Sequence, residues 1–125
     1  MLWDPKARLL LAGDTVEDTV TYVDEPRHLG AHLRDLERLL ALEPAAILPS
    51  HGDPEAIAAG GYGPGLIGAT QDYIRLLRRM PAEPALRALP LRALLATQLA
   101  AGDLRYFEPY ERVHRENVRA VLDAT

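Results

Sequence analysis

The sequence predicts an α/β fold in which a short βαβ unit is followed by a helical extension. Two short apolar runs, at residues 8–12 and 45–48, have the length of strands and end in turn-forming residues. Between these runs, leucines recur at helical spacing. From residue 60 onwards, glycines and prolines separate apolar patterns of helical period. We therefore divide the chain into an α/β segment, residues 1–59, and a C-terminal helical extension, residues 60–125.

The first predicted strand covers residues 8–12 and is closed by Gly13 and Asp14. A continuous apolar run of this length is typical of a strand that is buried on both faces. Residues 19–23 are β-branched and aromatic, so we expect at most a brief extended piece there. A buried strand that begins only a few residues after Met1 indicates a missing N-terminal portion.

A helix and a second strand follow. Asp24 and Pro26 provide an N-cap candidate and a first-turn proline, and the helical pattern stops at Pro44. Residues 45–48 form the second apolar run, and the turn-rich residues 49–54 come next. The predicted apolar face of the helix consists of Leu29, Leu33, Leu36 and Leu40.

The remaining elements are predicted to be helices. Asp53 and Pro54 favour the cap and first turn of a short helix that ends at Gly60. After a loop rich in glycine and proline, three longer apolar patterns of helical period follow. They begin near Leu66, Pro90 and Pro109 and end at Pro81, Gly102 and Ala124.

Composition excludes several functional classes. The chain has 125 residues, of which 48% are hydrophobic, enough for one domain with its own core. Its 14 basic and 18 acidic side chains are interleaved, so we expect no nucleic-acid partner. The absence of cysteine excludes disulfides, thiol nucleophiles and thiolate metal ligands. No apolar stretch has the length of a membrane span or the pattern of a signal peptide, so we expect no membrane partner and a cytoplasmic location.

Asp14 and His51 each come directly after a predicted strand. A βαβ unit places its two strands parallel, and ligand sites in such sheets form at the carboxyl ends of the strands. Carboxylate oxygen and imidazole nitrogen are both common zinc ligands, so the two side chains are candidates for one cation. Ordinary turn roles for both residues are the alternative.

A family resemblance favours the metal interpretation. Leu9-Leu10-Leu11-Ala12-Gly13-Asp14-Thr15, followed by Ile47-Leu48-Pro49-Ser50-His51-Gly52-Asp53, resembles the last two ligand motifs of metallo-β-lactamase-fold hydrolases, a group that includes glyoxalase II-like thioesterases. The intervening helix and interval match as well, and the resemblance covers residues 2–53. It implies the C-terminal half of the αββα fold, with Asp14 bridging two metal ions and His51 binding the second.

The remainder of that metal site has no counterpart in the sequence. The family motif His-x-His-x-Asp-His is absent, and the chain has only four histidines. A catalytic zinc usually has three protein ligands and an open position, so we expect this chain alone to be inactive. The resemblance implies a parent enzyme that hydrolyses an ester, thioester, amide or similar bond of a small-molecule substrate, using zinc, with iron or manganese as alternatives.

Two further residues are candidates for contact with substrate. Tyr62 lies in the glycine-rich loop of residues 60–65, which has the composition of a mobile lid, although a plain interhelix linker is the favoured alternative. His114 shares a helical face with Tyr110 and Val118, which suggests either a half-buried structural histidine or a group that faces substrate.

Other polar residues are assigned ordinary roles. His28 and His32 lie four residues apart on the predicted helix, but no glutamate follows His28 as in zinc-binding His-Glu-x-x-His, so solvated or packing roles are favoured. Glu17 and Asp18 are either solvated or placed behind the metal ligands. Asp53 is expected to cap a helix.

A non-catalytic function is the alternative to a hydrolase. In that case the helical extension would provide a surface for dimerisation or for binding another protein. Both hypotheses predict that exposed apolar surface is covered, either by a second copy in a homo-oligomer or by the missing N-terminal half.

Overall fold

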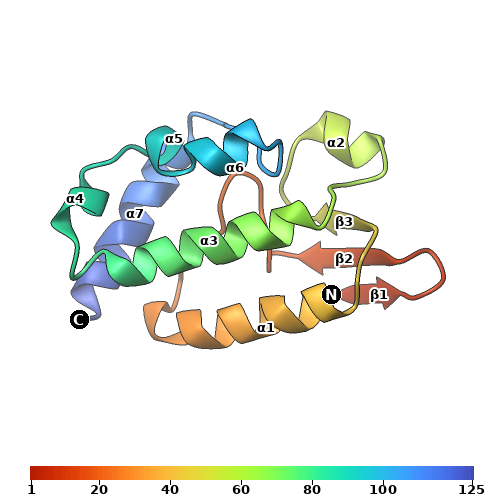
Figure 1. Cartoon of the computed structure of the whole chain (residues 1–125), viewed down its shortest axis with the longest axis horizontal. Helices are drawn as coiled ribbons and strands as arrows, with labels where there is room; N and C mark the ends of the chain where they lie inside the picture. Colours follow the sequence, from red (N-terminus) through yellow and green to blue (C-terminus); the bar gives the residue numbers. More distant parts are fainter.

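The protein is a mixed α/β structure in which a three-stranded sheet lies beside a set of helices (Figure 1). The structure is a computed structural model and describes residues 1–125. The strands are β1 (Leu2–Asp4), β2 (Leu9–Gly13) and β3 (Ala46–Pro49). The helices are the 3-10 helix η1 (Pro26–His28), α1 (Leu29–Ala41), α2 (Pro54–Ala58), α3 (Gly65–Arg79), α4 (Pro84–Arg87), α5 (Leu91–Leu94), α6 (Ala96–Ala100) and α7 (Tyr110–Asp123).

The predicted βαβ unit is present. β2 and β3 are parallel neighbours joined through α1, with Leu10 opposite Ile47 and Gly13 opposite Pro49. β1 was not predicted, because three residues are too few to produce a recognisable alternation. It pairs antiparallel with β2 and forms the opposite edge of the sheet from β3.

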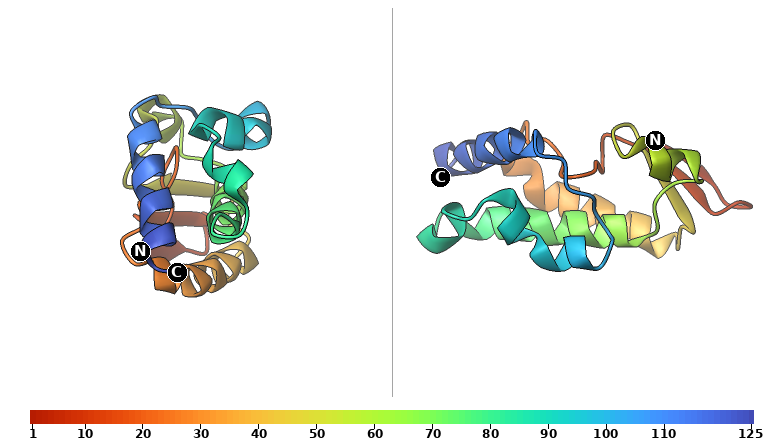
Figure 2. Two further views of the ribbon diagram at one scale, coloured as in Figure 1. Left: turned by 90° about the vertical axis from the view of Figure 1, so that its left-hand side faces the viewer. Right: turned by 90° about the horizontal axis from the view of Figure 1, so that it is seen from above.

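The two faces of the sheet have different surroundings. On the inner face, Leu10, Ala12 and Ile47 are buried, and α1 and α3 lie on the same side of the sheet (Figure 2). On the outer face, cross-strand register aligns Leu2, Leu11 and Leu48 in one row. Leu2 is 68% exposed and Leu11 is 38% exposed, so the chain itself leaves this row largely uncovered.

One hydrophobic core runs through both of the predicted segments. It contains 22 buried residues and includes side chains from β2, β3, α1, α3 and α7. The helical extension therefore does not form a core of its own. It packs on the α/β segment, mainly through contact between α3 and α1.

Residues 19–23 form no strand, so the brief strand considered for them is absent. Backbone and side-chain groups of this region bond to the C-terminal part of the chain instead of to a sheet. The Thr19 hydroxyl donates to the Arg105 carbonyl oxygen at 2.7 Å, and the Val23 N–H donates to Asn117 Oδ1 at 2.9 Å. These partners are distant in sequence, so local propensity could not indicate them.

The helices agree with the sequence pattern except at three places. The first helix begins as η1 and continues as α1, because Pro26 opens a 3-10 turn. The helix predicted from Pro90 to Gly102 is divided into α5 and α6 at Leu95, where φ is −104° and ψ is 20°. The short helix α4 was not predicted. None of the helices combines the length and apolar character that crossing a membrane requires.

Candidate functional site

Asp14 and His51 lie together at the carboxyl ends of two adjacent parallel strands, as the sequence predicts. Asp14 follows β2 and His51 follows β3, and their Oδ1 and Nε2 atoms are 3.7 Å apart. The Ser50 N–H donates to the Gly13 carbonyl oxygen at 3.0 Å, which joins the two strand ends. The Asp14 and His51 side chains are 73% and 64% exposed, so both remain open to additional groups.

The pair fits two positions of a metal coordination sphere. Ligands at zinc distances of about 2.0–2.2 Å in tetrahedral geometry are separated by about 3.3–3.6 Å, close to the observed spacing. Carboxylate and imidazole also form a donor set that zinc, iron and manganese accept. However, no cluster of three or more histidine, aspartate, glutamate or cysteine side chains in the chain could hold a metal ion. The pair therefore supplies two candidate ligands, fewer than the three protein ligands that a catalytic zinc usually has.

Asp18 holds the loop that carries His51. Its backbone N–H donates to the His51 carbonyl oxygen at 3.2 Å, and its side chain is buried. The carboxylate accepts from the Tyr62 hydroxyl at 2.5 Å and from the Arg105 N–H at 2.7 Å. Burial raises the pKa of Asp18 above its ordinary value, although both hydrogen bonds act in the opposite direction. Of the roles that the sequence left open for Asp18, the structure supports a place behind the candidate ligands.

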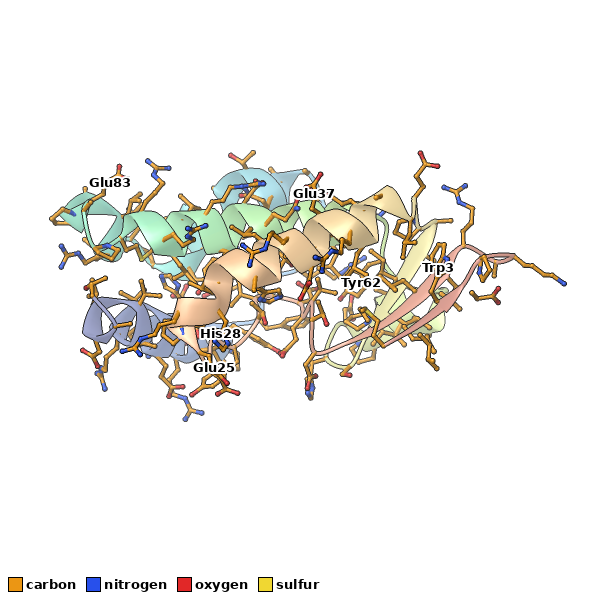
Figure 3. All side chains as sticks on the ribbon, turned by 90° about the horizontal axis from the view of Figure 1, so that it is seen from below. Trp3, Glu25, His28, Glu37, Tyr62 and Glu83 are labelled. Carbon is orange, nitrogen blue, oxygen red and sulfur yellow. The ribbon has the colours of Figure 1, made fainter.

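Tyr62 lies inside the molecule beside the sheet (Figure 3) and is only 4% exposed. Besides donating to Asp18, its hydroxyl accepts from the Asp53 N–H at 2.7 Å. Its backbone N–H and C=O both bond to Ile47 of β3 at 2.7 Å. Burial and the Asp18 carboxylate raise the pKa of Tyr62 to about 12. These contacts fix the loop to the sheet, which agrees with the favoured interhelix linker and not with a mobile lid. They also favour a structural role for Tyr62 over contact with substrate.

Gly61 explains why the loop before Tyr62 is rich in glycine. Its φ is +110°, which side chains of L-residues rarely allow. A Cβ at this position would lie 2.6 Å from the Ile47 carbonyl oxygen. Glycine is therefore required where the backbone closes onto β3.

Glu17 lies close enough to Asp14 and His51 to interact with both electrostatically. It is half-buried, and burial raises its pKa. His51 partly offsets this rise, whereas Asp14 adds to it. The Tyr110 hydroxyl lies 3.4 Å from Glu17 Oε2, a long and weak hydrogen bond. Glu17 thus adds negative charge near the pair without completing a ligand set.

His28 and His32 do not form a metal pair. His28 Nδ1 lies 2.8 Å from Glu25 Oε2 on the surface, where both residues are visible in Figure 3. His32 Nε2 lies 2.8 Å from the Thr15 carbonyl oxygen and so ties the turn after Asp14 to α1. These contacts agree with the solvated and packing roles expected. Both histidines and Asp14 line an open groove of about 590 Å³.

His114 is more deeply buried than expected, with 2% exposure. Its Nδ1 lies 2.8 Å from the Tyr73 hydroxyl, which also receives a hydrogen bond from Asn117 Nδ2 at 3.0 Å. Sequence reasoning missed Asn117, although it lies three residues after His114 on the same helical face. Asn117 could have been found in the sequence because it is a polar residue at a position where the helical period places an apolar one.

No protein-family model matches the chain, and neither a curated protein nor a solved structure matches it. Its function is therefore inferred from its own residues and their geometry.

Proposed function

We propose that the chain is the C-terminal part of a metal-dependent hydrolase of the metallo-β-lactamase superfamily. The observation that carries this proposal is the Asp14–His51 pair, 3.7 Å apart at the ends of neighbouring parallel strands. Both residues stand in the two motifs whose order and interval resemble that family. Asp14 would bridge two metal ions and His51 would bind one of them.

The site is arranged to receive ligands from outside these 125 residues. Both side chains are exposed, whereas the loops behind them are fixed by Asp18 and Tyr62 through buried hydrogen bonds. A rigid support beneath exposed ligands reduces the cost of ordering them when a metal ion binds. When present, such ions activate water for hydrolysis of an ester, thioester, amide or similar bond of a small molecule.

The outer face of the sheet supports the same proposal. The sequence of β2 predicts a strand buried on both faces, but the chain covers only the inner one. The row of Leu2, Leu11 and Leu48 is suited to pack against another layer, because burial of leucine side chains is favourable. We propose that this layer belongs to the N-terminal half of the enzyme or, when that half is absent, to a second copy of the chain.

Metal analysis tests the proposal directly. Zinc, manganese and iron should be measured in the 125-residue chain and in a longer product that includes upstream coding sequence. We expect stoichiometric metal and hydrolysis of thioester or ester substrates only for the longer product. In that product, Asp14→Ala and His51→Ala should each lower metal content, whereas the exposed control His28→Ala should not. A longer product that binds no metal and cleaves no such bond contradicts the hydrolase.

A non-catalytic module is the second candidate function. The specific observation in its favour is that no three potential ligands converge anywhere in the chain, while an apolar sheet face is uncovered. This alternative predicts self-association or binding of another protein without metal. Chelation of the longer product separates the two candidates, because only the hydrolase predicts that this product loses activity when its metal is removed.

A further inference from the structure

Two guanidinium groups from different helices meet over Gly30. α1 and α3 lie side by side and run in opposite directions, so the first turn of α1 lies beside the last turn of α3 (Figure 1). A Cβ atom placed on Gly30 would lie 3.6 Å from Arg34 Nη1 of α1 and 4.0 Å from Arg78 Nη1 of α3. The absence of a side chain at Gly30 therefore leaves a small space that both guanidinium groups border.

Neither of these two arginines is neutralised within the chain. Neither takes part in an ion pair, and α1 has no acidic residue in its first turn. By contrast, Arg38 on α1 pairs with Asp35 at 2.8 Å. Arg75 on α3 likewise lies 3.5 Å from Asp72. Because like charges held close together repel, the arrangement over Gly30 favours a negative group from outside the chain.

We propose that Arg34 and Arg78 bind a phosphate group over Gly30. Both Nη1 atoms border the same point, so one tetrahedral oxyanion between them can accept a charge-assisted hydrogen bond of about 2.8 Å from each. Guanidinium suits phosphate because its planar donors match the geometry of the phosphate oxygens.

The site is open, since both arginines are exposed, and it admits free phosphate as well as the phosphate group of a larger molecule. The chain as a whole has a formal net charge of −4 and therefore does not attract anions generally. The inference is independent of the proposed hydrolase, because it uses neither Asp14 nor His51.

Phosphate titration of the whole 125-residue chain, labelled with ¹⁵N and observed by NMR, tests the proposal. Sodium phosphate is the probe, and sodium chloride at equal ionic strength is the control. We expect phosphate, but not chloride, to shift the Gly30 amide resonance with saturation, at a Kd on the order of 1–10 mM. Phenyl phosphate should shift the same resonance. If it binds more tightly than inorganic phosphate, the site belongs to a phosphate monoester, and if it binds less tightly, to free phosphate.

Matched double variants identify the donors. Arg34→Gln/Arg78→Gln should weaken phosphate binding about tenfold, because it removes both guanidinium groups over Gly30. Arg38→Gln/Arg75→Gln removes the same charge from the same two helices but spares these donors. This control should weaken binding by less than about twofold, through the loss of general charge alone.

Substitution of Gly30 tests the position of the bound group. A Cβ atom there would make ordinary van der Waals contacts, so a short side chain is tolerated. Gly30→Asp provides a carboxylate of the chain itself between the two guanidinium groups and should abolish phosphate binding. Gly30→Asn, of the same size but uncharged, should retain it.

Three results would overturn the proposal. The first is a Gly30 shift that does not saturate or that chloride reproduces equally, which would indicate screening without a site. The second is equal weakening by the two double variants, which would mean that Arg78 only offsets the charge at the end of α3 and that Arg34 is merely solvated. The third is unchanged phosphate binding by Gly30→Asp, because the anion would then lie elsewhere.

Discussion

The hydroxyl of Tyr62 donates a 2.5 Å hydrogen bond to the Asp18 carboxylate, and both side chains are buried. Because the same hydroxyl accepts from the Asp53 N–H, its own hydrogen is directed to Asp18. Through the Tyr62 hydroxyl, Asp18 in the loop after β2 is joined to Asp53 in the loop after β3. The two candidate metal ligands extend from these loops.

Tyr62→Phe should destabilise the protein by about 1–3 kcal/mol, because it leaves the buried Asp18 carboxylate and the Asp53 N–H each without one hydrogen-bond partner. Urea denaturation followed by circular dichroism measures the change. Tyr22→Phe is the matched control, since Tyr22 is 51% exposed, and it should change stability by less than about 0.5 kcal/mol. Equal effects of the two substitutions would contradict the role assigned to Tyr62.

Gly61→Ala should destabilise the fold by about 2 kcal/mol or more, because the alanine would have a strained positive φ and its Cβ would meet the Ile47 carbonyl oxygen. Gly63→Ala, two residues later, has open space around its Cβ position and no positive φ. It should be nearly neutral in thermal unfolding. Similar melting temperatures for both variants would show that the loop is not held on β3.

Asp14→Ala and His51→Ala should each change the free energy of unfolding by less than about 0.5 kcal/mol in the metal-free chain, because exposed ion pairs contribute little to stability. Thermal unfolding monitored by calorimetry provides the comparison. A large loss of stability in both variants would favour structural turn roles for the two residues. Leu36→Ala, a substitution in the buried core, is the positive control, and its loss of stability shows that the assay detects a destabilised fold.

Glu17→Gln should increase stability at neutral pH. Burial raises the pKa of Glu17 in the folded protein above its ordinary value of 4.5, so the charged form is disfavoured by folding. The stabilising contribution of a protonated Glu17 is complete below that ordinary value and is lost as pH rises through the raised pKa. Denaturation of both proteins across pH 4 to 8 should therefore show curves that converge on acidification and separate towards neutrality. Curves that separate only at acidic pH would contradict the sign of this shift.

Leu10 and Leu11 are adjacent in β2 but face opposite sides of the sheet. Leu10→Ala should cost about 2–5 kcal/mol, because it creates a cavity in the core. Leu11→Glu should leave the fold intact and instead reduce self-association, because it places a charge in the row of outer-face leucines. Unfolding titrations and analytical ultracentrifugation separate the two effects. A self-associating chain that is unaffected by Leu11→Glu would show that another surface forms the contact.

The sequence was most informative where signals were local. The strand ends before Asp14 and His51, the leucine face of α1 and the limits of α3 and α7 follow from short-range spacing, capping residues and prolines. The βαβ rule then placed Asp14 beside His51 without structural information. β1 was too short to recognise from its pattern.

The supporting network could not be predicted in the same way. Asp18 finds its partners at Tyr62 and Arg105, which are 44 and 87 residues away along the chain. Similarly, Asn117 bonds to the backbone of Thr21 and Val23, 96 and 94 residues away. No local propensity encodes such pairings. The glycine-rich loop before Tyr62 also has the same composition whether it is a mobile lid or a loop fixed to the sheet.

The bare outer face of the sheet would link metal binding to association under the proposed function. Asp14 and His51 lie just beyond the ends of the strands that carry Leu11 and Leu48, so a layer covering those leucines also approaches the candidate ligands. If that layer contributes ligands, metal binding and association are thermodynamically linked. Metal binding then raises the association constant by the same factor by which association raises the affinity for the metal. Metal binding would then depend on protein concentration, and a chelator would shift the assembly towards separate chains.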